Sequence, residues 1–211
     1  MTLPPLMAIV DADAAARAGW TMVDLAAAYL DGGARLIQIR AKRMSSADLL
    51  EVACAVVTRA RSAQATVIVN DRADIARLAG ADGVHVGQDD LAPADVRTIL
   101  GADASVGRST HTPEQVESAL REPISYVAIG PVFDTATKAT GYEALGLGPV
   151  RHVARLTRER GVPLVAIGGV TLDTALDVLR AGAQSVVVVG DLVRTGDPAA
   201  RVRAYQKHLT V

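Results

Sequence analysis

Residues 67–90 read VIVNDRADIARLAGADGVHVGQDD, and this stretch contains one complete strand–helix–strand unit. Two short apolar runs, Val67–Val69 and Val84–Val86, are typical of buried strands. The helical segment between them ends at Ala79-Gly80-Ala81, where the glycine predicts a helix-to-strand turn. Each apolar run is followed at once by polar residues, namely Asn70, Asp71, Gln88, Asp89 and Asp90. The stretch therefore predicts two consecutive strands that each deliver acidic side chains beyond their ends.

The rest of the chain repeats this unit. Near-continuous apolar runs are expected of parallel strands covered on both faces, and they predict strands at 6–10, 35–39, 66–69, 83–86, 104–107, 125–129, 163–167 and 184–189. Eight such strands alternating with amphipathic helices in 211 residues predict a single α/β domain over residues 1–211, a TIM barrel. The alternative is a doubly wound sheet, which usually has a glycine-rich first turn, whereas the first turn here is VDADAA.

Cap and turn residues support the helices between these strands. Ser45 or Ser46 is a candidate N-cap, and Thr112 is another, with Pro113 at the first helical position. The triplets Gly32-Gly33-Ala34 and Ala181-Gly182-Ala183 repeat the turn seen at Gly80. We interpret this repeat as a helix-to-strand turn rather than as a functional motif.

Composition limits the kinds of partner. The net charge of −1 gives no basic excess for nucleic acid. The N-terminus lacks the pattern of a secretory signal, and no run approaches the ~18 apolar residues of a membrane span. We expect a cytoplasmic protein that acts on small molecules, with no nucleic acid or membrane partner, and homo-oligomer formation stays open. The single cysteine, Cys54, lies in an apolar helical stretch and is expected to be buried.

Polar residues gather where the predicted strands end, which is where the active site of a parallel barrel lies. In chain order they are Gln38, Arg40, Lys42, Asn70, Asp71, Gln88, Asp89, Asp90, Arg108, Ser109, Thr110, His111, Thr135, Thr137, Lys138, Gly168, Gly169, Gly190 and Asp191. Carboxylates beside amides, without a His or Cys cluster, favour Mg²⁺ over Zn²⁺. Because Mg²⁺ usually takes only one or two protein carboxylates, Asp71 and one of Asp89 or Asp90 suffice if the substrate carries a diphosphate.

Cations and glycines complete this prediction. Arg40, Lys42 and Lys138 can offset diphosphate charge. The glycines at 168, 169 and 190 predict a second anion site, because the loops after the last two strands of such barrels often bind phosphate through backbone N–H groups. Simpler interpretations stay open: an Asp after a strand is often only a helix N-cap. Similarly, His85 fits a packed core histidine, and His111 fits a residue that orients a loop.

Five segments together resemble the thiamine phosphate synthase family, a TIM-barrel family. They are QIRAK, VNDRADIARLAGADGVHVGQDDL, GRSTHT, AIGPVFDTATK and VAIGGVT, all in the family's order. The resemblance implies the joining of a hydroxymethylpyrimidine diphosphate to a hydroxyethylthiazole phosphate, or to its carboxylated form. The products would be thiamine phosphate and pyrophosphate. It also implies that the C–O bond to the diphosphate breaks first, leaving a carbocation that the thiazole nitrogen captures.

The resemblance also implies residue roles by motif position. The pyrimidine diphosphate would be bound by Gln38, Arg40, Lys42, Asn70, Ser109 and Lys138, and Lys138 would help pyrophosphate leave. Mg²⁺ would be bound by Asp71 and Asp90. The thiazole would be held by Thr135 and Thr137, with its phosphate at Gly169, Val189 and Gly190. Of these roles, those of Arg40, Lys42, Ser109 and Lys138 would be catalytic.

The chain departs from the family's pattern at two single positions and in the loop after Lys138, where ATGYEALGLG stands in place of a Pro-rich continuation. Gly190 stands where Ser is common, and Asp134 stands where Pro is frequent. Two alternatives to the synthase are a thiazole tautomerase, with His111 as its catalytic histidine, and a catalytically silent ligand-binding barrel. An isomerisation would not need the Mg²⁺-diphosphate residues, which favours the synthase.

Overall fold

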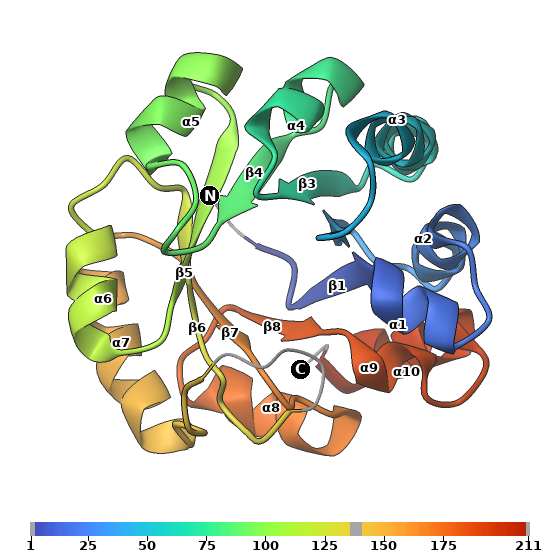
Figure 1. Cartoon of the computed structure of the whole chain (residues 1–211). Coiled ribbons are helices and arrows are strands. Elements are labelled where there is room, and N and C mark those ends of the chain that lie inside the picture. The colour runs from blue at the N-terminus through green and yellow to red at the C-terminus, as the bar shows by residue number, and fades with distance from the viewer. Residues whose placement is uncertain (1–2, 136–140, 210–211) are drawn as a thin grey trace.

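Eight parallel strands close into a barrel in the order β1 to β8, which confirms the predicted TIM barrel (Figure 1). The computed structural model describes residues 3–135 and 141–209. The strands are β1 (Leu6–Asp11), β2 (Leu36–Arg40), β3 (Thr66–Asn70), β4 (Gly83–Val86), β5 (Ser105–Thr110), β6 (Tyr126–Ile129), β7 (Leu164–Ile167) and β8 (Ser185–Val188). Because β1 pairs with β8, the sheet has no open edge, and the doubly wound alternative is excluded.

Helices form a ring around the barrel (Figure 1). They are α1 (Ala12–Arg17), α2 (Met22–Asp31), α3 (Ser46–Ser62), α4 (Ala73–Ala79), α5 (Pro93–Leu100), α6 (Pro113–Ala119), α7 (Leu147–Glu159), α8 (Leu172–Arg180), α9 (Gly190–Val193) and α10 (Pro198–Leu209). Their starts follow the predicted caps: Ser45 accepts a hydrogen bond from Asp48 N, and Thr112 accepts one from Gln115 N. None of the helices in the described part of the chain has the length and apolar character needed to cross a bilayer.

Alternation along the strands divides the core into two layers. In β1, Leu6, Ala8 and Val10 pack outward against the helices, whereas Met7 and Ile9 fill the barrel interior. Both faces of β1 are therefore apolar, which explains its near-continuous apolar run in the sequence. The interior is packed tightly around Tyr126: a Cβ on Gly107 would lie 2.2 Å from its ring.

The repeated glycine triplets are helix-to-strand turns, as predicted. Gly33, Gly80 and Gly182 all have positive φ values, of 97°, 66° and 111°. Glycine adopts this left-handed conformation without the steric cost that a Cβ brings.

The predicted end of β5 was wrong. The apolar run ends at residue 107, but the strand continues to Thr110, since Arg108, Ser109 and Thr110 pair with Val127, Ala128 and Ile129 of β6. Hydropathy missed this extension because polar side chains replace apolar ones at the mouth of the barrel while the backbone pairing continues. Ser109 is therefore held by a strand rather than by a loop.

The prediction that Cys54 is buried was also wrong, because its side chain is exposed. The buried stripe of α3 runs through Leu49, Ala53, Val56, Val57 and Ala60. Cys54 directly follows Ala53, so it lies about 100° around the helix from that stripe. An apolar run in the sequence does not by itself show which helix face a residue occupies.

We expect Cys54→Ser to change the free energy of unfolding by less than about 0.5 kcal/mol, because the thiol contributes little to the core. Native protein should react with a thiol reagent such as dithionitrobenzoate as fast as urea-unfolded protein does. Strong protection of the thiol in the native state would contradict this placement.

Candidate active site

Asp71 and Asp90 meet at the carboxyl ends of β3 and β4. Their carboxyl groups lie within hydrogen-bonding reach of each other. Lys42 Nζ lies 2.5 Å from Asp71 Oδ2, and the Gly87 N–H donates to Asp90 Oδ2 at 2.8 Å. Asp89, by contrast, is exposed. Of the two adjacent acids, the structure therefore joins Asp90 to Asp71.

The two carboxyl groups titrate differently. Burial raises the pKa of Asp71 above its ordinary value, and the neighbouring Asp90 adds to this effect while Lys42 opposes it. Burial also acts to raise the pKa of Asp90, but hydrogen bonds with Gly87 N–H and Asp71 outweigh it and hold that pKa below its ordinary value. Two acids held together in this way favour a bound cation, which relieves their repulsion.

The backbone at Asp71 supports a functional role. Its φ is +62°, a conformation that residues other than glycine rarely adopt, and Arg72 N donates to Asn70 O across it at 2.8 Å. The N-cap of α4 is Arg72 and that of α5 is Ala92, neither with a side-chain cap. The simpler interpretation of Asp71 and Asp90 as helix caps is therefore wrong.

The donor set fits Mg²⁺ better than a transition metal. Among residues 3–135 and 141–209, no group of three or more His, Cys, Asp or Glu side chains is placed to hold a metal ion. A structural or catalytic Zn²⁺ needs at least three such ligands, whereas Mg²⁺ takes one or two carboxylates and keeps its remaining positions for water and phosphate oxygens. Asp71 and Asp90 supply such a pair.

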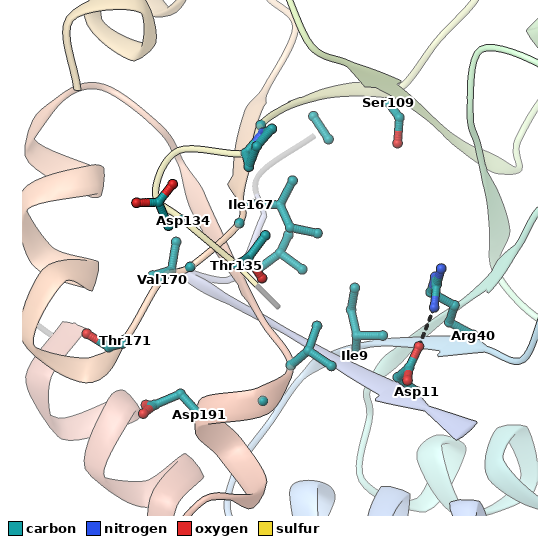
Figure 2. Close-up of a pocket in the computed structure, with 18 of the residues that line it drawn as sticks. Ile9, Asp11, Arg40, Ser109, Asp134, Thr135, Ile167, Val170, Thr171 and Asp191 are labelled. Carbon is teal, nitrogen blue, oxygen red and sulfur yellow. Dashed lines mark hydrogen bonds and ion pairs between the residues drawn. The ribbon is translucent and has the colours of Figure 1, made fainter. Parts of the chain in front are cut away.

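A cavity of about 510 Å³ opens at the ends of β1, β2 and β5 to β8, at the same end of the barrel as this pair (Figure 2). Several predicted site residues line it: Arg40, Ser109, Thr135, Gly169, Val189 and Gly190. The predicted residues Gln38, Lys42, Asn70, Asp71 and Asp90 do not line it. Gln38 lies buried inside the barrel, with Nε2 3.9 Å from Met7 Sδ. Thr137 and Lys138 lie outside the described residues. The structure thus places the acid pair and a larger, mainly apolar cavity at the same end of the barrel.

Asp11 is a site residue that sequence reasoning missed. It ends β1, is 2% exposed and lies 2.5 Å from Arg40 Nη1 (Figure 2). Its other carboxylate oxygen accepts a hydrogen bond from Ala14 N at the start of α1. Asp11 therefore fixes the direction of the Arg40 guanidinium. Its position after the first apolar run, in VDADAA, was the available signal.

Ser109 is held by a hydrogen-bonded chain through the barrel interior. His85 Nε2 lies 2.8 Å from Ser109 Oγ, and His85 Nδ1 lies 3.0 Å from the Tyr126 hydroxyl. Complete burial raises the pKa of Tyr126, so its hydroxyl stays protonated. The expectation that His85 is a packed, hydrogen-bonded core histidine is confirmed, and it also contacts a predicted site residue.

The end of the cavity at β7 and β8 is built from close backbone contacts. Gly168 and Gly169 have φ values of +103° and +64°, and a Cβ on Gly169 would lie 2.4 Å from Asp134 O. Gly190 begins α9, and Val189 precedes it as the N-cap. Asp134, one of the two departures from the family pattern, is exposed at the rim of this end. Only glycine fits at positions 168 and 169, because a Cβ there would overlap the chain at Pro131 and at Phe133–Asp134.

His111 lines the same cavity. Its Nδ1 lies 2.5 Å from Gly130 O, and its ring stacks on Tyr142 with centroids 4.3 Å apart. Gln115 accepts a hydrogen bond from His111 N and donates to the Tyr142 hydroxyl. These contacts match the interpretation that His111 orients a loop, because they tie β5 to the segment that follows β6.

Comparisons with known proteins agree with this geometry. The family described as thiamine monophosphate synthase matches residues 6–192. A thiamine-phosphate synthase from Koribacter versatilis is 42% identical over 97% of this chain and 95% of its own length. One from Thermus thermophilus is 40% identical over 92% of this chain and 93% of its own.

A solved structure has the same fold. Thiamine phosphate pyrophosphorylase from Pyrococcus furiosus superposes with a TM-score of 0.86 at 26% identity, over 97% of this chain and 94% of that one. These relatives are named as thiamine-phosphate synthases and a thiamine phosphate pyrophosphorylase, which are transferases, and they span nearly all of the chain. The chain therefore belongs to the thiamine monophosphate synthase family, and it is a transferase of that family.

Proposed function

We propose that the protein condenses hydroxymethylpyrimidine diphosphate with hydroxyethylthiazole phosphate, or its carboxylated form, to give thiamine phosphate and pyrophosphate, with the carboxyl group of the latter substrate released as CO2. The observation that carries this proposal is the meeting of Asp71, Asp90 and Lys42 at the end of the barrel where a cavity lined by Arg40, Ser109 and backbone glycines opens. One corner suits a metal-bound diphosphate, and the opposite end suits a phosphate monoester. Membership of the family supports the same reaction.

Asp71 and Asp90 would hold Mg²⁺, which when bound neutralises charge on the diphosphate leaving group. Lys42 and Arg40 contribute fixed positive charge on the same side of the barrel mouth. Asp11 orients Arg40, and His85 holds the Ser109 hydroxyl in place at the wall of the cavity. Gln38, Asn70 and Lys138 complete the proposed contacts to the pyrimidine diphosphate. Because Arg40 and Ser109 are positioned before the substrate arrives, little reorganisation accompanies the reaction.

The reaction itself needs no nucleophile from the protein. The C–O bond to the diphosphate breaks, and pyrophosphate leaves with the electron pair. The thiazole nitrogen then donates its lone pair to the resulting carbocation and forms the new C–N bond. Apolar walls that include Ile9, Ile167 and Val187 keep water from this cation. Thr135 and Thr137 would hold the thiazole, with its phosphate at Gly169, Val189 and Gly190.

An assay for both products tests the proposal. Purified protein is incubated with the two phosphorylated substrates and Mg²⁺, and thiamine phosphate and pyrophosphate are measured. We expect the two products in equal amounts. Isomerisation of the thiazole without pyrophosphate release would favour the tautomerase, with His111 as its histidine. Binding without turnover would favour the silent barrel.

We expect Lys138→Ala to lower kcat by about 100-fold, because a cation that offsets charge on the departing pyrophosphate acts mainly in the transition state. Lys207→Ala is a matched control, since Lys207 is exposed on α10, and its kcat should equal that of the wild type. A Lys138→Ala enzyme with unchanged kcat would remove Lys138 from the mechanism.

A further inference from the structure

Asp191 is a buried carboxylate in the wall of the cavity, at the end proposed for the thiazole phosphate. It is the second residue of α9, directly after Gly190, and its side chain is 4% exposed. Gly169 and Thr171 line the cavity beside it. A fixed anion at this place opposes the binding of a phosphate unless its charge is cancelled, because Coulomb repulsion is weakly screened in a partly dry cavity.

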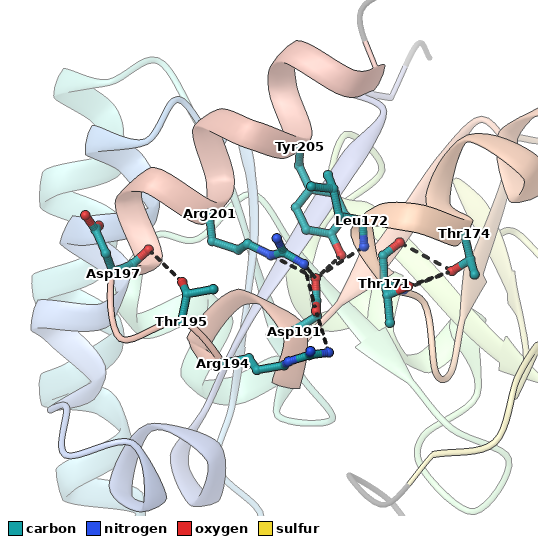
Figure 3. A network of polar contacts seen from close by, with 9 residues as sticks. All are labelled: Thr171, Leu172, Thr174, Asp191, Arg194, Thr195, Asp197, Arg201 and Tyr205. Atoms are coloured by element: carbon teal, nitrogen blue, oxygen red, sulfur yellow. Dashed lines mark hydrogen bonds and ion pairs between the residues drawn. The ribbon is translucent and has the colours of Figure 1, made fainter.

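The C-terminal helix α10 supplies the cancelling charge (Figure 3). Arg201 donates to both carboxylate oxygens of Asp191 at 2.8–3.1 Å, through Nε and Nη2. The Tyr205 hydroxyl donates to Asp191 Oδ2 at 2.6 Å. Burial raises the pKa of Tyr205, and Asp191 raises it further, so the hydroxyl keeps the proton that it donates. Asp191 and Arg201 thus form an ion pair without net charge, in which both carboxylate oxygens of Asp191 accept hydrogen bonds.

The same carboxylate reaches the start of α8. Leu172 N, the first N–H of that helix, donates to Asp191 Oδ2 at 3.3 Å, beside a capping box between Thr171 and Thr174. Arg194 also lines the cavity, is 76% exposed and lies 4.0 Å from Asp191 Oδ1. With Asp191 neutralised by Arg201, the charge of Arg194 is left to favour an anion at this end of the cavity.

We propose that Arg201 is a positioning residue that sets the affinity for the thiazole phosphate by neutralising Asp191. This inference rests on the proposed function, because it takes the phosphate to lie at Gly169 and Gly190. It makes α10, a helix of the outer ring, a determinant of substrate affinity. None of the three network residues Asp191, Arg201 and Tyr205 needs to touch the substrate for this effect.

The test compares how two opposite changes of charge, at Arg201 and at Asp191, alter the affinity for the phosphate ester. Hydroxyethylthiazole phosphate and unphosphorylated hydroxyethylthiazole are titrated into the protein by calorimetry. Arg201→Gln exposes the carboxylate and should weaken binding of the phosphate ester about tenfold. Asp191→Asn removes the carboxylate but keeps an acceptor oxygen, and should tighten binding about threefold. The double variant should return to within about threefold of the wild type, and the unphosphorylated compound should not respond.

A network that only maintains the fold gives a different pattern. Both single variants would then weaken binding of both compounds and lower Tm, with no recovery in the double variant, and that result would overturn the inference. If Arg201→Gln does not fold, the affinity of Asp191→Asn for hydroxyethylthiazole phosphate decides. Unchanged or weaker binding of the phosphate ester by that variant would contradict the inference. Arg203→Gln, at an exposed position of the same helix, is the control and should leave the Kd unchanged.

Failure of the proposed function and failure of this inference are detected by different measurements. The first appears as the absence of thiamine phosphate in the wild-type assay, whereas the charge effect is measured by binding alone. A wild-type protein that binds both thiazole compounds equally well would overturn the inference even if the synthase reaction proceeds.

Discussion

Asp71→Ala should lower kcat/KM by about 1,000-fold, the largest effect expected of any single substitution in this chain. Asp71 provides one of the two carboxylates proposed for Mg²⁺, and its backbone is held in a left-handed conformation that directs it toward Asp90. Loss of one ligand leaves a single carboxylate to hold the ion. Titration of activity with Mg²⁺ should show a shift of at least about 100-fold in the concentration required.

Asp89→Ala is the matched control for this prediction. Asp89 adjoins Asp90 in sequence and carries the same charge, but it is exposed and has no described contact with Asp71. Its kcat/KM should stay within about twofold of the wild type. EDTA should abolish wild-type turnover, and added Mg²⁺ should restore it. Full activity in EDTA, or equal losses in the Asp71 and Asp89 variants, would contradict the metal site.

Arg40→Met should both destabilise the protein and reduce activity. Asp11 is 2% exposed, and Arg40 is the cation paired with it at 2.5 Å. Removing the cation leaves a buried carboxylate unpaired, which costs about 3 kcal/mol of unfolding free energy. Activity should fall about 100-fold, because the diphosphate also loses a positioned cation. Urea unfolding and steady-state kinetics measure the two effects independently.

The double variant Arg40→Met/Asp11→Asn separates these two effects. It removes the unpaired charge while Asn can still cap α1 by accepting from Ala14 N, so stability should return to within about 1 kcal/mol of the wild type. Activity should stay low, since the cation for the diphosphate is still absent. Recovery of activity together with stability would show that Arg40 acts only through the fold.

Much of the fold could be predicted because its signals are local. Each strand is a short apolar run, and each turn before a strand carries a glycine such as Gly33, Gly80 or Gly182 with positive φ. The closing order of the barrel then follows from alternating strands and helices, since parallel strands need crossovers. The acids of residues 67–90 could be assigned to one site for the same reason, because the ends of consecutive parallel strands meet at one rim.

Hydropathy gave wrong predictions where the polarity of the side chains does not follow the backbone structure. The polar residues Arg108, Ser109 and Thr110 remain in β5 because pairing depends on the backbone, not on side-chain polarity. Cys54 lies in an apolar run but turns outward, since the helical period sets its direction. Local composition predicts that an element exists more reliably than it predicts which way one residue points.

The sequence by itself indicated the order of strands and helices, the resemblance to the family, and Asp71 with one of Asp89 or Asp90 as candidate metal ligands, and the structure brings Asp90 to Asp71. Only the tertiary structure decided that Asp11 holds Arg40, that His85 holds Ser109 and that Arg201 neutralises Asp191. The reason is physical. Periodicity and capping depend on residues a few positions apart, whereas these contacts join strands and helices that meet only when the barrel closes.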